Sequence, residues 1–284
     1  MRVLAGHPEL CAINTATLGF QTPIEDTIEA VARAGFGGLA PWRREIEGKN
    51  VAAIARRIRE AGLKITGYCR STYIPAADRA GFLANVEANR RAIADAAVLG
   101  AQSFVMVVGG LPAGSKNIAA ARSQVAEATA LLVETGRKLG VRIALEPLHP
   151  VYAAERSCLS LLSEALDLCE AIEPSAAQPW LGACIDVYHV WWDPNLARDI
   201  ARAGMQQRIF GFHVCDWLVP TVDVLNDRGM MGDGVIDIPG IRRLIEQAGY
   251  VGLVEAEIFS ERNWWQRPIA GTLDVCKERF AGAT

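Results

Sequence analysis

Four apolar segments of the chain each end in a side chain that can ligate a metal ion. Apolar runs of this length are typical of buried parallel strands. Their last residues are therefore expected to lie at strand ends, where they can meet. The segments are V-R-I-A-L-E at 141–146, L-G-A-C-I-D at 181–186, I-F-G-F-H at 209–213 and L-V-E-A-E at 253–257.

The four terminal side chains are Glu146, Asp186, His213 and Glu257. Three carboxylates and one imidazole make a hard, mostly oxygen ligand set, which suits Mn²⁺ or Mg²⁺ and also accepts Co²⁺ or Zn²⁺. One carboxylate at a strand end is usually a cap or an ion-pair partner. The occurrence of four such side chains at the same end of four strands favours a shared metal site.

Glu255 competes with Glu257 for the fourth ligand position. It has the same side-chain parity but lies one layer lower in the expected strand. We expect Glu257 to be the ligand and Glu255 to pair with Arg142 inside the barrel.

Three polar residues stand three positions beyond predicted ligands and are expected to face the same site. His149 and His189 follow Glu146 and Asp186, and we expect substrate contact from both; the alternative is a histidine bonded to backbone. Asp216 follows His213 and either orients the imidazole or binds substrate.

Side chains at the expected rim provide further candidates for substrate binding. Trp42 follows the second strand and offers an apolar face for a sugar ring. Arg70 and Lys116 carry positive charges at the same rim and are candidates for binding an anionic group, although solvated rim charges are common.

Strand-like and helical segments alternate eight times along the chain. This alternation predicts a parallel sheet, and eight units predict closure into an α/β fold of the (β/α)8 TIM-barrel type, as one domain spanning 1–284. The carboxyl ends of the strands carry the active site in such barrels. Strands are expected at 10–18, 36–42, 64–69 and 103–108, from 141, and at 181–186, 208–213 and 251–258; helices are expected at 23–34, 50–61, 78–99, 118–139, 160–172, 194–203, 239–248 and 268–280.

Side-chain parity predicts which residues point into the barrel. Successive strand residues face opposite sides, so the small and polar set points inward and the bulky set meets the helices. Phe210 and Phe212 are expected on the outer face, opposite Gly211 and His213.

The composition excludes several classes of protein. A net charge of −3 gives no basic excess, which argues against a nucleic-acid partner. The chain shows no apolar leader and no run long enough to span a membrane, so a cytoplasmic protein is expected. Its seven cysteines are scattered without a C-x-x-C pair and are expected to be free and mostly buried. A homo-oligomer is compatible with such a barrel.

Five short motifs together resemble the xylose isomerase-like TIM-barrel family of sugar (and sugar phosphate) isomerases and epimerases. They are E-P-L-H at 146–149, D-V-Y-H at 186–189, H-V-C-D at 213–216, G-D-G-V-I-D at 232–237 and E-I-F at 257–259. The likeness covers nearly the whole chain. The family also contains inosose dehydratases and endonuclease IV.

In the ketose 3-epimerases of that family, a glutamate, an aspartate, a histidine and a second glutamate hold Mn²⁺ or a similar ion. The resemblance implies the same role for Glu146, Asp186, His213 and Glu257, with the two glutamates also acting as acid and base. It further implies that His189 and Arg228 bind substrate hydroxyls.

The predicted reaction is isomerisation or epimerisation of a small carbohydrate or cyclitol ketone by proton transfer through a metal-stabilised enediolate. A dehydratase or lyase acting on a keto-cyclitol or keto-sugar is the alternative, because the metal site alone does not choose between them. A DNA-repair nuclease like endonuclease IV is a remote alternative. It requires extra histidines at the third and fourth strand ends, where this chain has Cys69-Arg70 and Val107-Val108.

Overall fold

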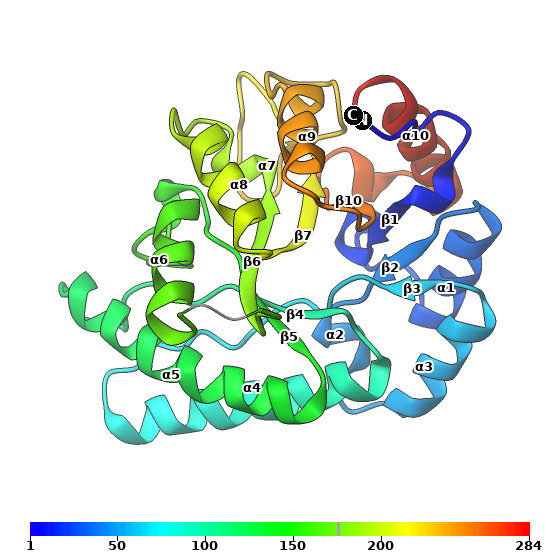
Figure 1. Cartoon of the computed structure of the whole chain (residues 1–284). Helices are drawn as coiled ribbons and strands as arrows, with labels where there is room; N and C mark the ends of the chain where they lie inside the picture. The colour runs from blue at the N-terminus through cyan, green and yellow to red at the C-terminus, as the bar shows by residue number, and fades with distance from the viewer. Residues whose placement is uncertain (175–176) are drawn as a thin grey trace.

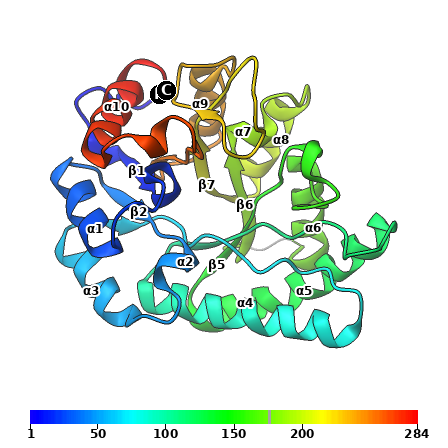
Figure 2. The same ribbon diagram turned by 180° about the vertical axis from the view of Figure 1, so that it is seen from behind.

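A parallel sheet of eight strands lies at the centre of the computed structural model, and helices surround it (Figures 1 and 2). The structure describes residues 1–174 and 177–284. The sheet order is β3-β2-β1-β10-β7-β6-β5-β4. Its strands are β1 (Cys11–Asn14), β2 (Gly38–Ala40), β3 (Lys64–Ile65), β4 (Ser103–Met106), β5 (Arg142–Leu145), β6 (Leu181–Asp186), β7 (Ile209–Val214) and β10 (Val254–Ala256).

Backbone hydrogen bonds close this sheet into a barrel. The first strand, β1, pairs with the last, β10. At the other join, Tyr68 just beyond β3 donates to Ser103 O at 2.9 Å and accepts from Val105 N at 3.1 Å, while Gln102 N donates to Ile65 O at 3.0 Å. The predicted TIM barrel is therefore confirmed.

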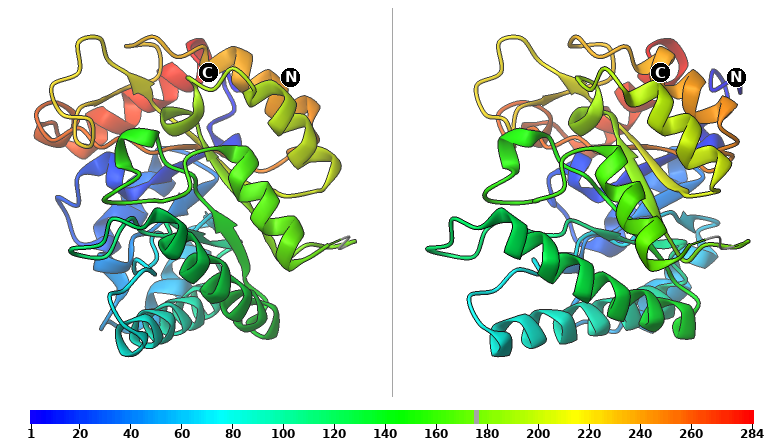
Figure 3. Two further views of the ribbon diagram at one scale, coloured as in Figure 1. Left: turned by 90° about the vertical axis from the view of Figure 1, so that its left-hand side faces the viewer. Right: turned by 60° about the vertical axis from the view of Figure 1, so that its left-hand side comes forward.

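The helices follow the predicted alternation closely. The two longest, α4 and α5, lie side by side along one flank of the barrel (Figure 3). The side chains of Asp78 and Asn117 accept hydrogen bonds from the first turns of these two helices, and left-handed glycines, Gly100 and Gly140, end them. The helices are α1 (Ile24–Arg33), α2 (Arg43–Ile46), α3 (Val51–Glu60), α4 (Arg79–Leu99), α5 (Ile118–Leu139), α6 (Leu162–Ile172), α7 (Val187–Val190), α8 (Leu196–Met205), α9 (Ile238–Gln247) and α10 (Ile269–Gly282).

The first strand is shorter than predicted. It ends at Asn14, whose side-chain oxygen accepts a hydrogen bond from Ala16 N at 3.2 Å and begins a 3-10 turn over Thr15–Leu18. A local side-chain bond to the backbone therefore ends the extended run at 14 instead of 18.

The parity prediction is correct for Phe212 and wrong for Phe210. The register between β6 and β7 shifts by one residue, because Ala183 pairs with Ile209 while Cys184 pairs with Gly211. Phe210 is the extra residue of this bulge, and it packs in the interior against Ala144 and Cys184. A bulge inverts the facing that strict alternation predicts.

A short antiparallel pair, β8 (Asp216–Trp217) and β9 (Arg228–Gly229), brackets a loop over the carboxyl ends of the strands. All seven cysteines are buried and free, as predicted. Among the described helices, none combines the length and apolar composition needed to cross a bilayer.

Candidate metal centre and active site

The four predicted ligands converge at the carboxyl end of the barrel. Asp186 and His213 are paired neighbours on β6 and β7, while Glu146 and Glu257 directly follow β5 and β10. All four side chains are buried, with at most 5% of each residue exposed. One ligand atom from each residue lies within 4.8 Å of the others, close enough for a single cation to contact all four.

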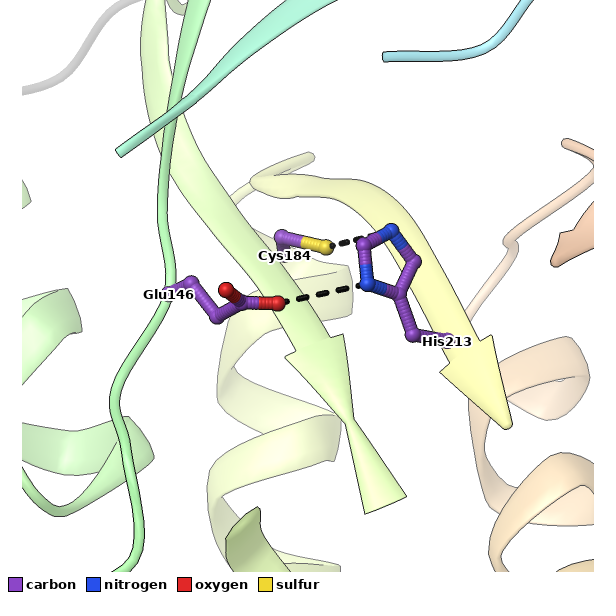
Figure 4. Close-up of side chains that lie close together, drawn as sticks. All are labelled: Glu146, Cys184 and His213. Carbon is purple, nitrogen blue, oxygen red and sulfur yellow. Dashed lines mark hydrogen bonds and ion pairs between the residues drawn. The ribbon is translucent and has the colours of Figure 1, made fainter. Parts of the chain in front are cut away.

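Among the residues that the structure describes, two atoms of this group have no hydrogen-bond partner. They are Oε1 of Glu146 and Nδ1 of His213, which are buried and lie 3.2 Å apart (Figure 4). Oε2 of Glu257 lies 3.6 Å from the same nitrogen. Orphaned ligand atoms that point at one another are what a cation site requires, so the residues fit a divalent metal ion.

The other ring nitrogen of His213 faces the layer below. Nε2 lies 3.2 Å from Oε1 of Glu255. It also lies 3.3 Å from Sγ of Cys184 (Figure 4). Asn14 Nδ2 donates to the same glutamate at 2.9 Å, and Thr66 donates to its second oxygen. Glu255 therefore orients the His213 ring and leaves Nδ1 available to a metal ion.

The predicted pairing of Glu255 with Arg142 is wrong. The Arg142 guanidinium lies over the Phe210 ring, 4.5 Å from its centroid, and its Nε donates to Gln102 O at 3.4 Å. The bulge turns Phe210 inward, and its ring provides the contact for Arg142 in place of Glu255.

The pKa values of the three buried carboxylates differ from their ordinary values. Burial raises the pKa of Glu146, and it raises the pKa of Asp186 to about 7. Burial also opposes ionisation of Glu257, but His213 and Arg228 outweigh it and lower the pKa of Glu257. A divalent cation would favour the ionised form of all three carboxylates.

The imidazole of His213 shows the complementary shift. Burial alone lowers its pKa, but Cys184, Glu255 and Glu257 around it raise the pKa well above the ordinary value. Without a metal, the structure therefore favours a proton on this ring.

Arg228 and His189 both lie next to the carboxylate of Asp186. Nη1 of Arg228 donates to Asp186 Oδ2 at 2.9 Å and to Glu257 Oε2 at 3.3 Å. His189 Nδ1 accepts from His149 N at 3.2 Å, and its Nε2 lies 3.6 Å from Asp186 Oδ2. Burial, together with Arg228, keeps the pKa of His189 well below its ordinary value, so the ring is neutral.

Four of the seven predicted substrate residues line the pocket above the ligands. These are Trp42, Arg70, His189 and Arg228, which line one pocket together with Glu146 and Glu257. The structure thus brings predicted ligands and predicted substrate contacts into one pocket.

The other three predicted substrate residues do not line this pocket. His149 accepts from Val151 N at 3.2 Å, and its ring packs against Trp217. Both carboxylate oxygens of Asp216 accept from backbone amides, including those of Gly232 and Ile236, so this side chain fixes the loop around 232–237 and does not contact the pocket. Lys116 is exposed in the loop before α5.

Several pocket residues escaped the sequence analysis. Phe259 had a usable signal, because it lies two residues beyond Glu257 in the E-I-F motif. Arg156 and Leu225 come from irregular loops, where no periodicity indicates direction. The loop of Leu225 is held by Tyr152 and Tyr188, whose hydroxyls donate to Val224 O at 2.7 and 2.8 Å.

Comparison with known proteins identifies the family of this chain. The family described as xylose isomerase-like TIM barrel matches residues 28–278. The chain belongs to this family. Curated proteins give no significant sequence match.

Solved structures of the family superpose along nearly the full chain. Protein SMc04130 from Sinorhizobium meliloti 1021 shares 48% identity, with 98% of this chain and 99% of that chain covered and a TM-score of 0.94. L-ribulose 3-epimerase shares 20% identity over 94% and 92% of the two chains, with a TM-score of 0.76. The IolI protein with a bound zinc atom shares 15% identity over 94% and 95%, with a TM-score of 0.79, and these two distant likenesses show a shared fold.

Proposed function

We propose that this member of the xylose isomerase-like family is a divalent-metal-dependent isomerase or epimerase that moves a proton at a carbon next to the ketone of a sugar or cyclitol. The observation that carries the proposal is the convergence of Glu146, Asp186, His213 and Glu257. Within the described part of the chain, Oε1 of Glu146 and Nδ1 of His213 are buried and have no hydrogen-bond partner. Mn²⁺ suits this set best, and Mg²⁺, Co²⁺ or Zn²⁺ are also compatible.

When bound, a divalent cation would polarise the substrate carbonyl and acidify the neighbouring C–H bond. The proton itself has to be taken up and returned by side chains of the chain. Glu146 and Glu257 approach the site from opposite sides. Glu146 follows β5, which lies next to β6, and Glu257 follows β10, which lies next to β7. One carboxylate can remove the proton while the other returns it, which is the arrangement that epimerisation needs.

Arg228 and His189 are suited to positioning the substrate oxygens. Arg228 neutralises part of the carboxylate charge and holds Asp186 and Glu257 in place. His189 is neutral; its Nδ1 accepts the backbone N–H of His149, and its Nε2 lies 3.2 Å from Nη2 of Arg228 and 3.6 Å from Oδ2 of Asp186. Trp42 and Phe259 provide apolar walls for a ring substrate.

A proton-exchange experiment tests this proposal. The Mn²⁺-loaded protein is incubated in deuterated water with a panel of ketoses and inososes, and NMR follows deuterium incorporation at the carbon next to the carbonyl. We expect incorporation by the wild type and a loss of at least ~100-fold in Glu257→Gln, in line with the usual contribution of general acid–base catalysis. Glu278→Gln, an exposed glutamate on α10, is the matched control and should keep the wild-type rate.

The same spectra separate the alternative reactions. An epimer or an aldose as product supports the proposal, whereas an unsaturated product formed with loss of water would identify a dehydratase. Exchange at the wild-type rate in Glu257→Gln would contradict the assigned proton transfer.

A further inference from the structure

Two arginines stand where the metal pocket opens into an outer groove. Arg70 and Arg156 line both spaces, together with Trp42 and Phe259. A substrate that binds Arg70 and Arg156 with one end can therefore reach Glu146 and Glu257 with its other end.

Neither arginine has an acidic partner among the described residues. The Arg70 guanidinium lies over the Tyr73 ring, 4.6 Å from its centroid, and that of Arg156 lies 5.6 Å from the centroid of Tyr152. Nε of Arg156 is buried and makes no hydrogen bond in the described part of the chain. By contrast, the neighbouring Arg43 donates to Glu47 at 3.0 Å.

The two positive charges are close enough to affect each other. Burial lowers the pKa of Arg70, and Arg156 and Arg43 lower it further. The folded chain therefore holds like charges together in a partly buried wall, which is unfavourable unless an anion joins them.

The carboxylates of the metal pocket do not supply this anion. Asp186 and Glu257 pair with Arg228, and Glu146 and Glu255 face His213. Among the described residues, none of these four carboxylates forms an ion pair with Arg70 or Arg156. Arg70 and Arg156 remain uncompensated. Guanidinium groups present planar forks of N–H donors that match carboxylate and phosphate oxygens.

We propose that Arg70 and Arg156 bind a carboxylate or phosphate group at the end of the substrate remote from the metal, so that the substrate is an acidic sugar. This inference rests on the proposed function for the carbonyl end of the substrate. The anion-binding part is a property of the two arginines and can be tested separately.

The first test uses inorganic phosphate and metal-free protein, so that it does not depend on turnover. Phosphate binding is measured by ³¹P NMR for the wild type, Arg70→Gln, Arg156→Gln and the double variant, with folding checked by circular dichroism. Arg79→Gln is the matched control, because Arg79 also lies over an aromatic ring, Phe82, but pairs with Glu127 and lines neither space.

We expect saturable phosphate binding to the wild type and to Arg79→Gln. Each pocket variant should weaken it about tenfold or more, because a charge-assisted hydrogen bond typically contributes at least that factor. No saturable binding to the wild type, or equal binding to the double variant, would overturn the inference.

The second test compares a neutral ketose with its terminal phosphate and with the corresponding ketouronate in the deuterium-exchange assay. We expect kcat/KM for one acidic substrate to exceed that of the neutral sugar about tenfold or more. The preference should disappear in Arg70→Gln and Arg156→Gln, because KM for the acidic substrate rises more than KM for the neutral sugar. Whether the phosphate or the carboxylate is favoured identifies the source of the anion.

The two tests separate the two claims. Phosphate binding that depends on the arginines, without exchange for any sugar, would support the anion site and contradict the proposed function. Exchange that is equal for neutral and acidic sugars and insensitive to both arginines would support the proposed function and overturn the anion site.

Discussion

His213 faces Glu146 with one ring nitrogen and Glu255 with the other, each at 3.2 Å. The contact between Nε2 and Glu255 sets the orientation of the ring, so that Nδ1 is available as a ligand. The histidine and the two carboxylates thus form one unit that spans two layers of the barrel interior.

Replacing Glu255 with Gln tests this positioning role. We expect Mn²⁺ affinity to fall about tenfold to a hundredfold, as is typical when the partner of a ligating histidine is changed. Isothermal titration calorimetry measures the affinity, and Glu278→Gln is the control. An unchanged dissociation constant in a folded Glu255→Gln protein would contradict the role.

Arg228 is expected to stabilise the metal-free protein more than the metal-bound protein. Its guanidinium bonds both Asp186 and Glu257, and breaking a buried ion pair costs about 3–5 kcal/mol. Arg228→Gln should therefore lower Tm strongly without metal, and Mn²⁺ should raise Tm more than in the wild type, because the cation replaces the missing positive charge. Equal Mn²⁺-induced shifts in Tm would contradict this explanation.

Metal binding should release protons. Burial raises the pKa of Asp186 to about 7, and His213 has a pKa raised well above its ordinary value by Cys184, Glu255 and Glu257 despite burial. Metal-bound ligands carry no such protons, so affinity should increase with pH, more steeply below pH 7 than above it. Calorimetry in buffers of different ionisation enthalpy counts the released protons, and affinity that is independent of pH from 6 to 8 would contradict the assignment.

Glu246, on α9, binds the start of the chain and should make stability depend on pH. It accepts from the Arg2 amide at 2.7 Å and from Arg242 Nε at 3.0 Å. Burial opposes ionisation, but these hydrogen bonds prevail and lower its pKa from 4.5. A lowered pKa gives stability that is present above 4.5 and is lost as the pH falls through the folded-state value.

Glu246→Gln should therefore reduce the free energy of unfolding by about 1–3 kcal/mol at pH 7, and the difference from the wild type should shrink below pH 4.5. Urea denaturation at pH 7 and below pH 4.5 measures the free energy of unfolding of both proteins. Glu87→Gln, at an exposed helical ion pair, should change stability by less than about 0.5 kcal/mol. A pH-independent difference would show that ionisation of Glu246 is not the cause.

The sequence predicted the parts of the site that lie on regular strands. Asp186 and His213 could be placed because a parallel strand directs alternate residues inward and all its carboxyl ends to one face. Helix bounds were accurate where a side-chain cap and a terminal glycine coincide, as at Asp78 and Gly100.

The remaining features depend on long-range contacts. The inward turn of Phe210 comes from a bulge between β6 and β7, which no local pattern signals. Arg156 reaches the pocket from an irregular loop, and Asp216 turns away because two backbone amides far along the chain, at 232 and 236, satisfy it.

The most direct test of the central claim is a Mn²⁺ titration of metal-stripped protein followed by electron paramagnetic resonance. We predict one tightly bound ion per chain in the wild type, and loss of that binding in both Asp186→Asn and His213→Ala when each remains folded. Absence of Mn²⁺, Mg²⁺, Co²⁺ or Zn²⁺ binding by the wild type, or undiminished binding by both variants, would contradict the proposed metal centre and the reaction built on it.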